Sequence, residues 1–295
     1  MDRSSPLRQR VRVAVTRRLP NSVETRMAEL FDLIPNPEDR KMTRDELAAA
    51  MRHSDVLVPT VTDRIDAPLL AQAGERLKLI ANYGAGVDHI DVQSARQRGI
   101  LVSNTPGVVT EDTADMTMAL ILAVTRRIPE GLAEMQAGRW EGWAPTQLLG
   151  VTLEGKKLGI LGFGRIGREL AAMARGFRME IHYRDIQKLP PEVEQGAIYH
   201  DNEDSFLSTI DIISMHVPGG DANRHWLNAE RIAKMTKGSL VVNSGRGVSV
   251  HDESLIAALK SGHIRAAGLD VYDGEPKVNP GYLTLENVAL LPHLG

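Results

Sequence analysis

The chain has 295 residues, of which 42% are hydrophobic and 25% are charged, and its formal net charge is −3. This length is sufficient for two domains with separate cores, and the nearly balanced charge excludes a strong electrostatic attraction to nucleic acid or to an anionic membrane. The sequence contains no cysteine, which excludes disulfides and thiolate chemistry and is typical of the reducing cytoplasm, and no apolar run reaches the length of a membrane span.

Short apolar strands alternate with helices through the first hundred residues. We predict strands at 11–15, 31–34, 56–58, 77–81 and 100–102. Asn21 is expected to cap a helix that runs through Glu29, and Thr43-Arg44-Asp45-Glu46 has the pattern of a capping box that opens a helix to Met51. This alternation indicates parallel βαβ units, so residues 1–102 are predicted to form one α/β domain. The arginines before and within the first strand are interpreted as solvated charges: Arg3, Arg8, Arg10 and Arg12.

A second series of strands follows a long predicted helix at 111–126. We predict six parallel strands, at 158–161, 180–183, 212–215, 240–243, 267–269 and 288–291. Six parallel strands with a glycine-rich turn after the first are typical of a Rossmann domain, which we place at residues 103–292. The fold class is therefore α/β, with two doubly wound parallel sheets, and the cleft between the two domains is the expected place for a substrate.

The glycine-rich turn is Gly162-Phe163-Gly164-Arg165-Ile166-Gly167. Gly162 permits a tight turn, Gly164 lets the backbone approach a pyrophosphate, and Gly167 lets the following helix pack close to the strand. Asp185 lies 18 residues after Gly167, where a carboxylate can accept hydrogen bonds from an adenosine ribose. The strand, the turn, the helix and the distant acid together predict a nicotinamide dinucleotide site.

Three polar side chains follow strands of this second series: Arg246, Glu275 and His293. Ligands bind at the carboxyl ends of the strands in open parallel sheets. A guanidinium can hold a 2-oxo carboxylate through two hydrogen bonds, and histidine titrates near neutrality, with a neighbouring carboxylate favouring its protonated form. Each residue alone is as readily explained by structure, but together they predict hydride transfer to a ketone, with His293 as the proton donor.

With these motifs the sequence resembles the D-2-hydroxyacid dehydrogenases. The shared patterns cover nearly the whole chain and lie at 82–91, 162–167, 243–247, 267–276 and 292–295. The resemblance implies a flavodoxin-like substrate domain, a Rossmann domain and a homodimer. The family usually continues for a few dozen residues beyond the position of His293 and returns to the substrate domain, so this segment is expected to be absent or truncated here.

The resemblance also implies a role for each matching residue. Arg246 binds the carboxylate and carbonyl of the substrate, His293 is the acid/base, and Glu275 orients and charges it. The backbone N–H groups of Ala85 and Gly86 hold the substrate carboxylate. Asp270 bonds the nicotinamide amide, and His216 is expected to be a wall of the adenosine side and not a catalyst. The full set assigned to the cofactor is Gly162, Gly164, Arg165, Ile166, Gly167, Asp185, His216, Val217, Pro218, Ser244, Asp270 and His293.

Cofactor and substrate selection rest on single positions. Asp185 favours NAD(H) because it would repel a 2′-phosphate, whereas Arg184 and Lys188 beside it leave NADP(H) possible. The stretch at 138–145 is similar to a loop of glyoxylate and hydroxypyruvate reductases in which a tryptophan of the neighbouring subunit borders the substrate pocket. Trp143 is the candidate here, and simple packing in a dimer interface is the alternative.

The resemblance therefore implies reduction of a small 2-oxo acid, glyoxylate or hydroxypyruvate, to the D-2-hydroxy acid. Two alternatives stay open: a dehydrogenase for another D-2-hydroxy acid, and an NAD(H)-sensing protein of the corepressor type with little turnover. Relatives of that type retain the same three residues, but the chain lacks charge-rich appended tails, which favours the enzyme. No metal site is expected, because His89 and its neighbouring acids do not share a ligand face and Asp91 is expected to cap the next helix.

Overall fold

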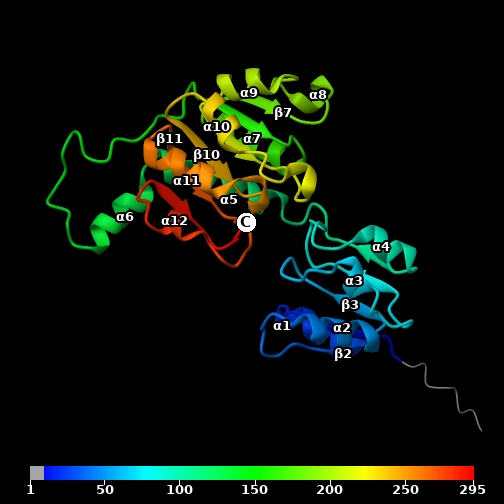
Figure 1. Ribbon diagram of the computed structural model, residues 1–295. Helices are drawn as coiled ribbons and strands as arrows, with labels where there is room; N and C mark the ends of the chain where they lie inside the picture. Colours follow the sequence, from blue (N-terminus) through cyan, green and yellow to red (C-terminus); the bar gives the residue numbers. More distant parts are fainter. Residues whose placement is uncertain (1–9) are drawn as a thin grey trace, which may run out of the picture. The chain divides into compact units, whose positions relative to one another are not determined.

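The computed structural model describes residues 10–295, and the chain divides into two compact units, Met1–Val108 and Val109–Gly295. Each unit is built on a parallel sheet of its own (Figure 1). The predicted fold class, two doubly wound parallel α/β domains, is confirmed. The division falls six residues beyond the predicted end of the first domain at 102.

The sheet of the first unit has the strand order β2-β1-β3-β4-β5. All its neighbouring strands are parallel. Its strands are β1 (Arg12–Val15), β2 (Asp32–Ile34), β3 (Val56–Val58), β4 (Leu79–Ala81) and β5 (Leu101–Ser103), and its helices are α1 (Asn21–Leu30), α2 (Arg44–His53), α3 (Ala67–Leu70) and α4 (Val92–Gln97). This is the flavodoxin-like order, with the reversal between β1 and β3.

Helix starts in this unit follow the chemistry of their caps. The Thr43 side chain accepts a hydrogen bond from the Glu46 N–H while the Glu46 carboxylate accepts one from the Thr43 N–H, so the capping box is confirmed. The Asp91 carboxylate accepts from the Ser94 N–H and caps α4 as predicted. The prediction that Asn21 caps α1 was wrong. Asn21 is the first helical residue, because the Pro20 carbonyl already accepts hydrogen bonds from the N–H groups of the first turn.

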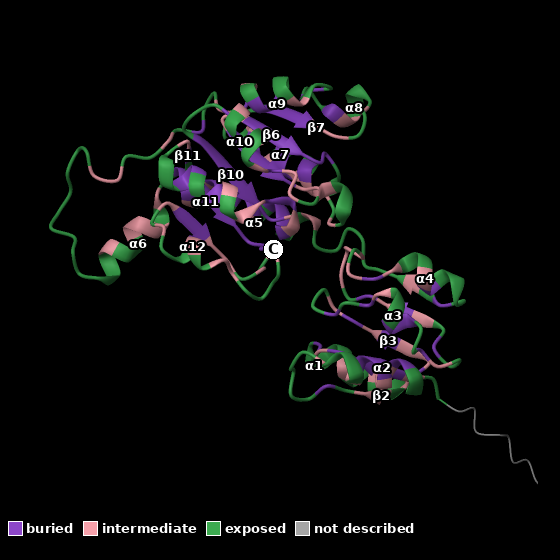
Figure 2. Cartoon of the chain, viewed as in Figure 1, coloured by how far each residue is buried: buried purple, intermediate pink, exposed green. Residues whose placement is uncertain are grey.

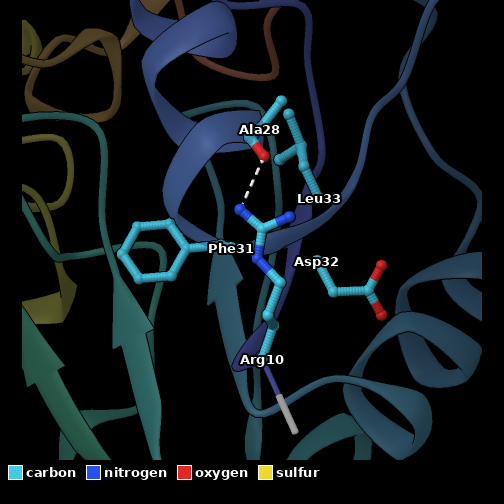
Figure 3. Close-up of a pocket in the computed structure, with 5 residues that line it drawn as sticks. All are labelled: Arg10, Ala28, Phe31, Asp32 and Leu33. Carbon is cyan, nitrogen blue, oxygen red and sulfur yellow. Dashed lines mark hydrogen bonds between the residues drawn. The ribbon is translucent and has the colours of Figure 1, made fainter. Parts of the chain in front are cut away.

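Two of the N-terminal arginines have partners within this unit, whereas Arg3 and Arg8 lie outside the described residues. The guanidinium of Arg10 donates to the carbonyl of Ala28 at 2.9 Å, at the last turn of α1 (Figure 3). It also donates to the carbonyl of Glu29. A cation in this position satisfies free carbonyls and complements the helix dipole. Arg12 pairs with Asp32 at 2.9 Å. Arg10 is exposed and 41% of the Arg12 side chain is exposed, so both charges are solvated as interpreted, but each also has a partner that the sequence interpretation did not include.

The second unit contains a seven-stranded parallel sheet with the order β12-β11-β10-β9-β6-β7-β8. Its strands are β6 (Lys157–Leu161), β7 (Glu180–Arg184), β8 (Ile198–Tyr199), β9 (Ile212–Met215), β10 (Ser239–Asn243), β11 (Ile264–Leu269) and β12 (Val288–Leu290). Counted from β6, this is the Rossmann order with a seventh strand added at one edge. Six strands were predicted. The sequence reading missed β8, because two residues show no periodicity.

Helices cover both faces of this sheet, and Figure 2 shows its strands buried between them. On one face lie α5 (Thr110–Thr125) and α7 (Arg165–Gly176), and on the other α9 (Glu203–Thr209), α10 (Ala229–Lys234) and α11 (Asp252–Ser261). The apolar side of α5 is buried in this core. The remaining helices are α6 (Ile128–Gln136), α8 (Pro191–Glu194), α12 (Pro280–Leu283), η1 (Asp221–Asn223) and η2 (Gly247–Ser249). Among residues 10–295, no helix combines the length and the apolar character that crossing a membrane requires.

Candidate active site

The glycine-rich turn joins β6 to α7. Gly162 has φ +89°, and a Cβ there would come within 2.8 Å of the His216 carbonyl oxygen. A Cβ at Gly167 would lie 2.5 Å from the Gly162 carbonyl oxygen and 2.9 Å from Ile160 Cγ2, so α7 packs against β6 at that point. A Cβ at Gly164 would meet no described atom within 4 Å. Gly164 is also the N-cap of α7 and provides no side-chain cap, which leaves open backbone at a positive helix end. This geometry fits a pyrophosphate.

Asp185 lies directly after β7, beside this turn. Its carboxylate accepts hydrogen bonds from the N–H of Phe163 at 2.7 Å and from its neighbour Ile186 at 2.7 Å. The acid is therefore held against the glycine-rich turn. The guanidinium of Arg184 points elsewhere, since it donates to the carbonyls of His200 and Asp201 after β8.

His216 follows β9 and lies against Gly162. Burial lowers the pKa of His216 to about 4, so its imidazole is neutral at neutral pH. The Nε2 atom is 2.8 Å from the Ser214 hydroxyl. A buried neutral ring next to the turn favours the role of a wall that we expect for His216, Val217 and Pro218. The other cofactor candidates lie around this edge: Arg165 and Ile166 begin α7, and the buried Ser244 hydroxyl is hydrogen-bonded to Thr117 of α5.

Arg246 is carried by a tight turn after β10. The amide of Asn243, which is fully buried, donates to the Arg246 carbonyl at 3.0 Å and accepts from the Gly245 N–H at 3.0 Å. A Cβ at Gly245 would lie 2.8 Å from the Met215 carbonyl oxygen, and one at Gly247 would collide with the backbone of Tyr272. The two glycines therefore let the turn pack between the end of β9 and the segment after β11.

Glu275 and His293 meet at the carboxyl ends of β11 and β12. Glu275 Oε2 accepts a hydrogen bond from His293 Nδ1 at 2.8 Å, and Glu275 Oε1 accepts one from the Tyr272 N–H at 2.9 Å. About a third of each side chain is exposed. His293 has φ +58°, a left-handed conformation that is uncommon outside glycine. The turn around it is held by Asp270, whose carboxylate is fully buried and accepts from the N–H groups of Leu294 and Gly295, each at 2.8 Å.

Electrostatics connect the three predicted catalytic residues. The hydrogen bond to Glu275 raises the pKa of His293 above its usual value, against the opposite effect of burial. Burial raises the pKa of Glu275, but its hydrogen bonds from His293 and Tyr272 and the charge of Arg246 outweigh it, so the pKa is lowered. The Arg246 charge lowers the pKa of both partners. Arg246 follows β10, and the Glu275–His293 pair lies at the carboxyl ends of the neighbouring parallel strands β11 and β12, so the three residues share one edge of the sheet. The second unit thus brings together Arg246, Glu275 and His293.

The remaining predicted residues belong to other segments of the chain. Ala85 and Gly86 belong to the first unit, where they lie half-buried in the loop after β4. The segment 137–156 between α6 and β6 contains no helix or strand (Figure 1). Trp143 belongs to this segment and is 81% exposed. Asp270 was predicted to bond the nicotinamide amide. Its carboxylate has the two backbone partners described above, and each oxygen keeps a further lone pair.

Sequence reasoning assigned no role to two groups that build the site. Asn243 was visible in the motif at 243–247, and its position just before a Gly-Arg-Gly turn is a signal for a side chain that holds the turn. The role of the Tyr272 N–H could not be found from the sequence, because every residue except proline has such a backbone donor.

Comparison with known proteins identifies the family of the chain. The protein-family model described as D-isomer specific 2-hydroxyacid dehydrogenase, NAD binding domain, matches residues 118–295. Glyoxylate reductase of Thermococcus litoralis is 42% identical over 289 residues, covering 96% of this chain and 87% of that protein. Glycerate dehydrogenase of Hyphomicrobium methylovorum is 37% identical over 286 residues, covering 96% and 89%. The crystal structure of an NADPH-dependent glyoxylate/hydroxypyruvate reductase from Sinorhizobium meliloti with NADP and malonate has a TM-score of 0.86 at 32% identity, covering 96% and 86%.

The parallel sheets, the glycine-rich turn and these similarities define an NAD(P)-dependent dehydrogenase. The chain belongs to the D-isomer specific 2-hydroxyacid dehydrogenase family, as the sequence motifs predicted.

Proposed function

We propose that the chain reduces glyoxylate or hydroxypyruvate to the D-2-hydroxy acid, with Arg246, Glu275 and His293 as the catalytic residues. The observation that carries the proposal is the 2.8 Å hydrogen bond between His293 and Glu275, with the Arg246 charge acting on both. The names of the relatives, glyoxylate reductase and glycerate dehydrogenase, support a small substrate of this kind.

Each residue has a task that follows from its chemistry. A bound nicotinamide supplies the hydride. Because the carboxylate of Glu275 can only accept, His293 Nδ1 donates to it, and Nε2 carries a proton only in the imidazolium form. The raised pKa of His293 keeps that form available, so Nε2 can protonate the oxygen that develops negative charge at C2. Arg246 holds the carboxylate and carbonyl oxygens of the substrate, and the N–H groups of Ala85 and Gly86 bind its carboxylate.

The first experiment follows oxidation of the reduced cofactor with a panel of 2-oxo acids, using NADH and NADPH in parallel. We expect turnover with glyoxylate or hydroxypyruvate, and a loss of about 10²- to 10⁴-fold in kcat for His293→Gln, the range that a general acid contributes. Cofactor binding by this variant, measured by fluorescence, serves as the control. Binding of NADH without turnover of any 2-oxo acid would contradict the proposal and favour the cofactor-sensing alternative.

We propose NAD(H) as the preferred cofactor, because the Asp185 carboxylate is fixed beside the glycine-rich turn and Arg184 is engaged by backbone carbonyls. A 2′-phosphate near Asp185 would be repelled. Asp185→Ser is therefore expected to raise the NADPH/NADH ratio of kcat/KM, and Lys188→Ser to lower it. An unchanged ratio for Asp185→Ser would remove this residue from the selection.

We also propose a homodimer in which α6 contributes to the interface. Ile128, Leu132 and Met135 recur at helical spacing and are all exposed, and no residue of α6 is buried (Figure 2). Trp140 and Trp143 follow in the adjoining segment and are also exposed. Leu132→Glu combined with Met135→Glu is expected to halve the mass in sedimentation equilibrium, with Ile186→Glu, an exposed apolar site after β7, as control. A wild-type monomer, or a variant that stays dimeric, would contradict this interface.

A further inference from the structure

The loop that follows β4 is organised by two asparagine side chains. Asn82 is only 2% exposed, and its amide nitrogen donates to the carbonyls of Gly84 at 3.0 Å and Gly86 at 2.9 Å. Asn104, which follows β5, donates from its amide to the carbonyl of Ala85 at 2.7 Å. Three successive backbone carbonyls are therefore each bound by a side-chain amide.

A third side chain fixes the orientation of Asn82 itself. The Nε2 atom of His89 is 3.0 Å from Asn82 Oδ1. An amide oxygen can only accept, so His89 donates from Nε2, and the amide nitrogen of Asn82 must face the two carbonyls. Every donor and the acceptor of this buried amide are thus used within one loop, which is the condition under which a buried polar group holds a single conformation.

The orientation of the carbonyls determines where the backbone N–H groups point. In a planar trans peptide, the carbonyl of one residue and the N–H of the next point in opposite directions. The bonds to Gly84 and Ala85 therefore turn the N–H groups of Ala85 and Gly86 away from the two asparagines. Within residues 10–295, neither N–H donates a hydrogen bond. A carbonyl that accepts a hydrogen bond also polarises its peptide, which strengthens the N–H as a donor.

We propose that Asn82 and Asn104 are positioning residues for recognition of the substrate carboxylate: by holding the carbonyls of Gly84 and Ala85, they aim the N–H groups of Ala85 and Gly86 at the anion. This inference rests on the proposed function, which assigns the carboxylate to these two N–H groups. The two asparagines act on different N–H groups. The Gly84 carbonyl, which sets the Ala85 N–H, accepts from Asn82 and also from the Thr105 N–H at 3.0 Å, whereas the Ala85 carbonyl, which sets the Gly86 N–H, accepts from Asn104.

The test uses the full chain with Asn104→Leu, which removes the donors at an exposed position, and Asn21→Leu as a surface control in the same unit. We expect KM for glyoxylate to rise about 5- to 10-fold in Asn104→Leu, the effect of one net hydrogen bond, with KM for NADH and the melting temperature unchanged. The ratio of kcat/KM for glyoxylate over its uncharged ethyl ester should fall by a similar factor. A residue with a structural role alone would not change this ratio.

A binding measurement separates this inference from the proposed activity. Oxamate, a carboxylate probe, is expected to shift the amide NMR signals of both Ala85 and Gly86 in the wild type. Asn104→Leu should weaken the response at Gly86, and Asn82→Asp, which keeps the acceptor for His89 but has no donor, should weaken that at Ala85. If Asn82→Asp does not fold, Asn104→Leu decides alone. An unchanged Gly86 response would overturn the inference even if glyoxylate is reduced, whereas absent turnover with the expected NMR responses would overturn only the proposed reaction.

Discussion

Gly167→Ala tests the contact between α7 and β6, and the structure sets the size of the effect. The added Cβ would lie 2.5 Å from the Gly162 carbonyl oxygen and 2.9 Å from Ile160 Cγ2. The oxygen belongs to the backbone and cannot rotate away, so α7 must move off the strand. Overpacking of this kind costs about 1–3 kcal/mol. In a unit of this size each kcal/mol lowers the melting temperature by about 2–4 °C, so we expect a fall of about 2–12 °C.

Two other glycines of the same segment provide matched controls. A Cβ at Gly164 or at Gly176 would meet no described atom within 4 Å. Gly176→Ala near the end of α7 is expected to stabilise the protein by about 0.5–1 kcal/mol, because alanine loses less backbone entropy than glycine. Gly164 has φ −72°, which suits alanine, so Gly164→Ala should melt like the wild type. It should nevertheless bind NADH more weakly, because the methyl group occupies the space where a pyrophosphate approaches the backbone.

Calorimetry of the cofactor-free protein and fluorescence titration with NADH measure the two effects separately. We expect Gly167→Ala to lose both stability and affinity, and Gly164→Ala to lose affinity alone. A wild-type melting temperature for Gly167→Ala would refute the packing argument. Wild-type affinity for Gly164→Ala would refute the placement of the pyrophosphate at this turn.

Three further predictions concern ionisable groups. Glu275→Gln removes the group that raises the pKa of His293, so the rate of reduction should begin to fall at lower pH than in the wild type, and an identical pH profile of kcat would contradict the pairing. Burial lowers the pKa of both His182 and His200 from 6.5, and His182 Nδ1 lies 2.9 Å from His200 Nε2. The unfolded chain then binds more protons below about pH 6.5, so stability should fall as the pH drops through this range and not above it. The melting temperature of His182→Gln should depend less on pH below 6.5 than that of the wild type. Equal pH dependence in the two proteins would contradict a role of His182 in this loss of stability. In Asp270→Asn an amide with one acceptor oxygen replaces a carboxylate whose two oxygens each accept a backbone hydrogen bond. The loss of one hydrogen bond to a charged group should lower the free energy of unfolding by about 1.5–3 kcal/mol. The substitution should lower kcat more than the affinity for NADH, and the reverse order would show that Asp270 acts mainly on the cofactor.

Much of the local structure could be predicted from short patterns. The capping box at Thr43 depends on residues three apart, and the turn at Gly162 depends on a glycine that adopts positive φ. Such features are determined by neighbours in the chain, so the sequence displays them directly. The strand β8 could not be predicted, because its two residues become a strand only by pairing with β7.

The candidate site was predicted as a set of residues, and the predicted pairing of Glu275 with His293 is confirmed by their 2.8 Å hydrogen bond, but the contacts that hold these residues in place were not predicted. Arg246, Glu275 and His293 each follow an apolar strand, which is visible in the sequence. That Asn243 holds the Arg246 turn while Tyr272 holds Glu275 was not predicted, because these bonds depend on backbone conformation.

The amino-acid sequence by itself determined the alternation of strands and helices, except for β8, and also the glycine-rich turn and the chemical identity of the proposed catalytic residues, because these depend on periodicity and on residues a few positions apart. Only the tertiary structure decided which groups meet. The parallel sheet aligns the carboxyl ends of β10, β11 and β12, and this alignment brings the His293 imidazole to the Glu275 carboxylate across 18 positions of the chain. Such a contact depends on the packing of whole elements and is therefore invisible in any local stretch of sequence.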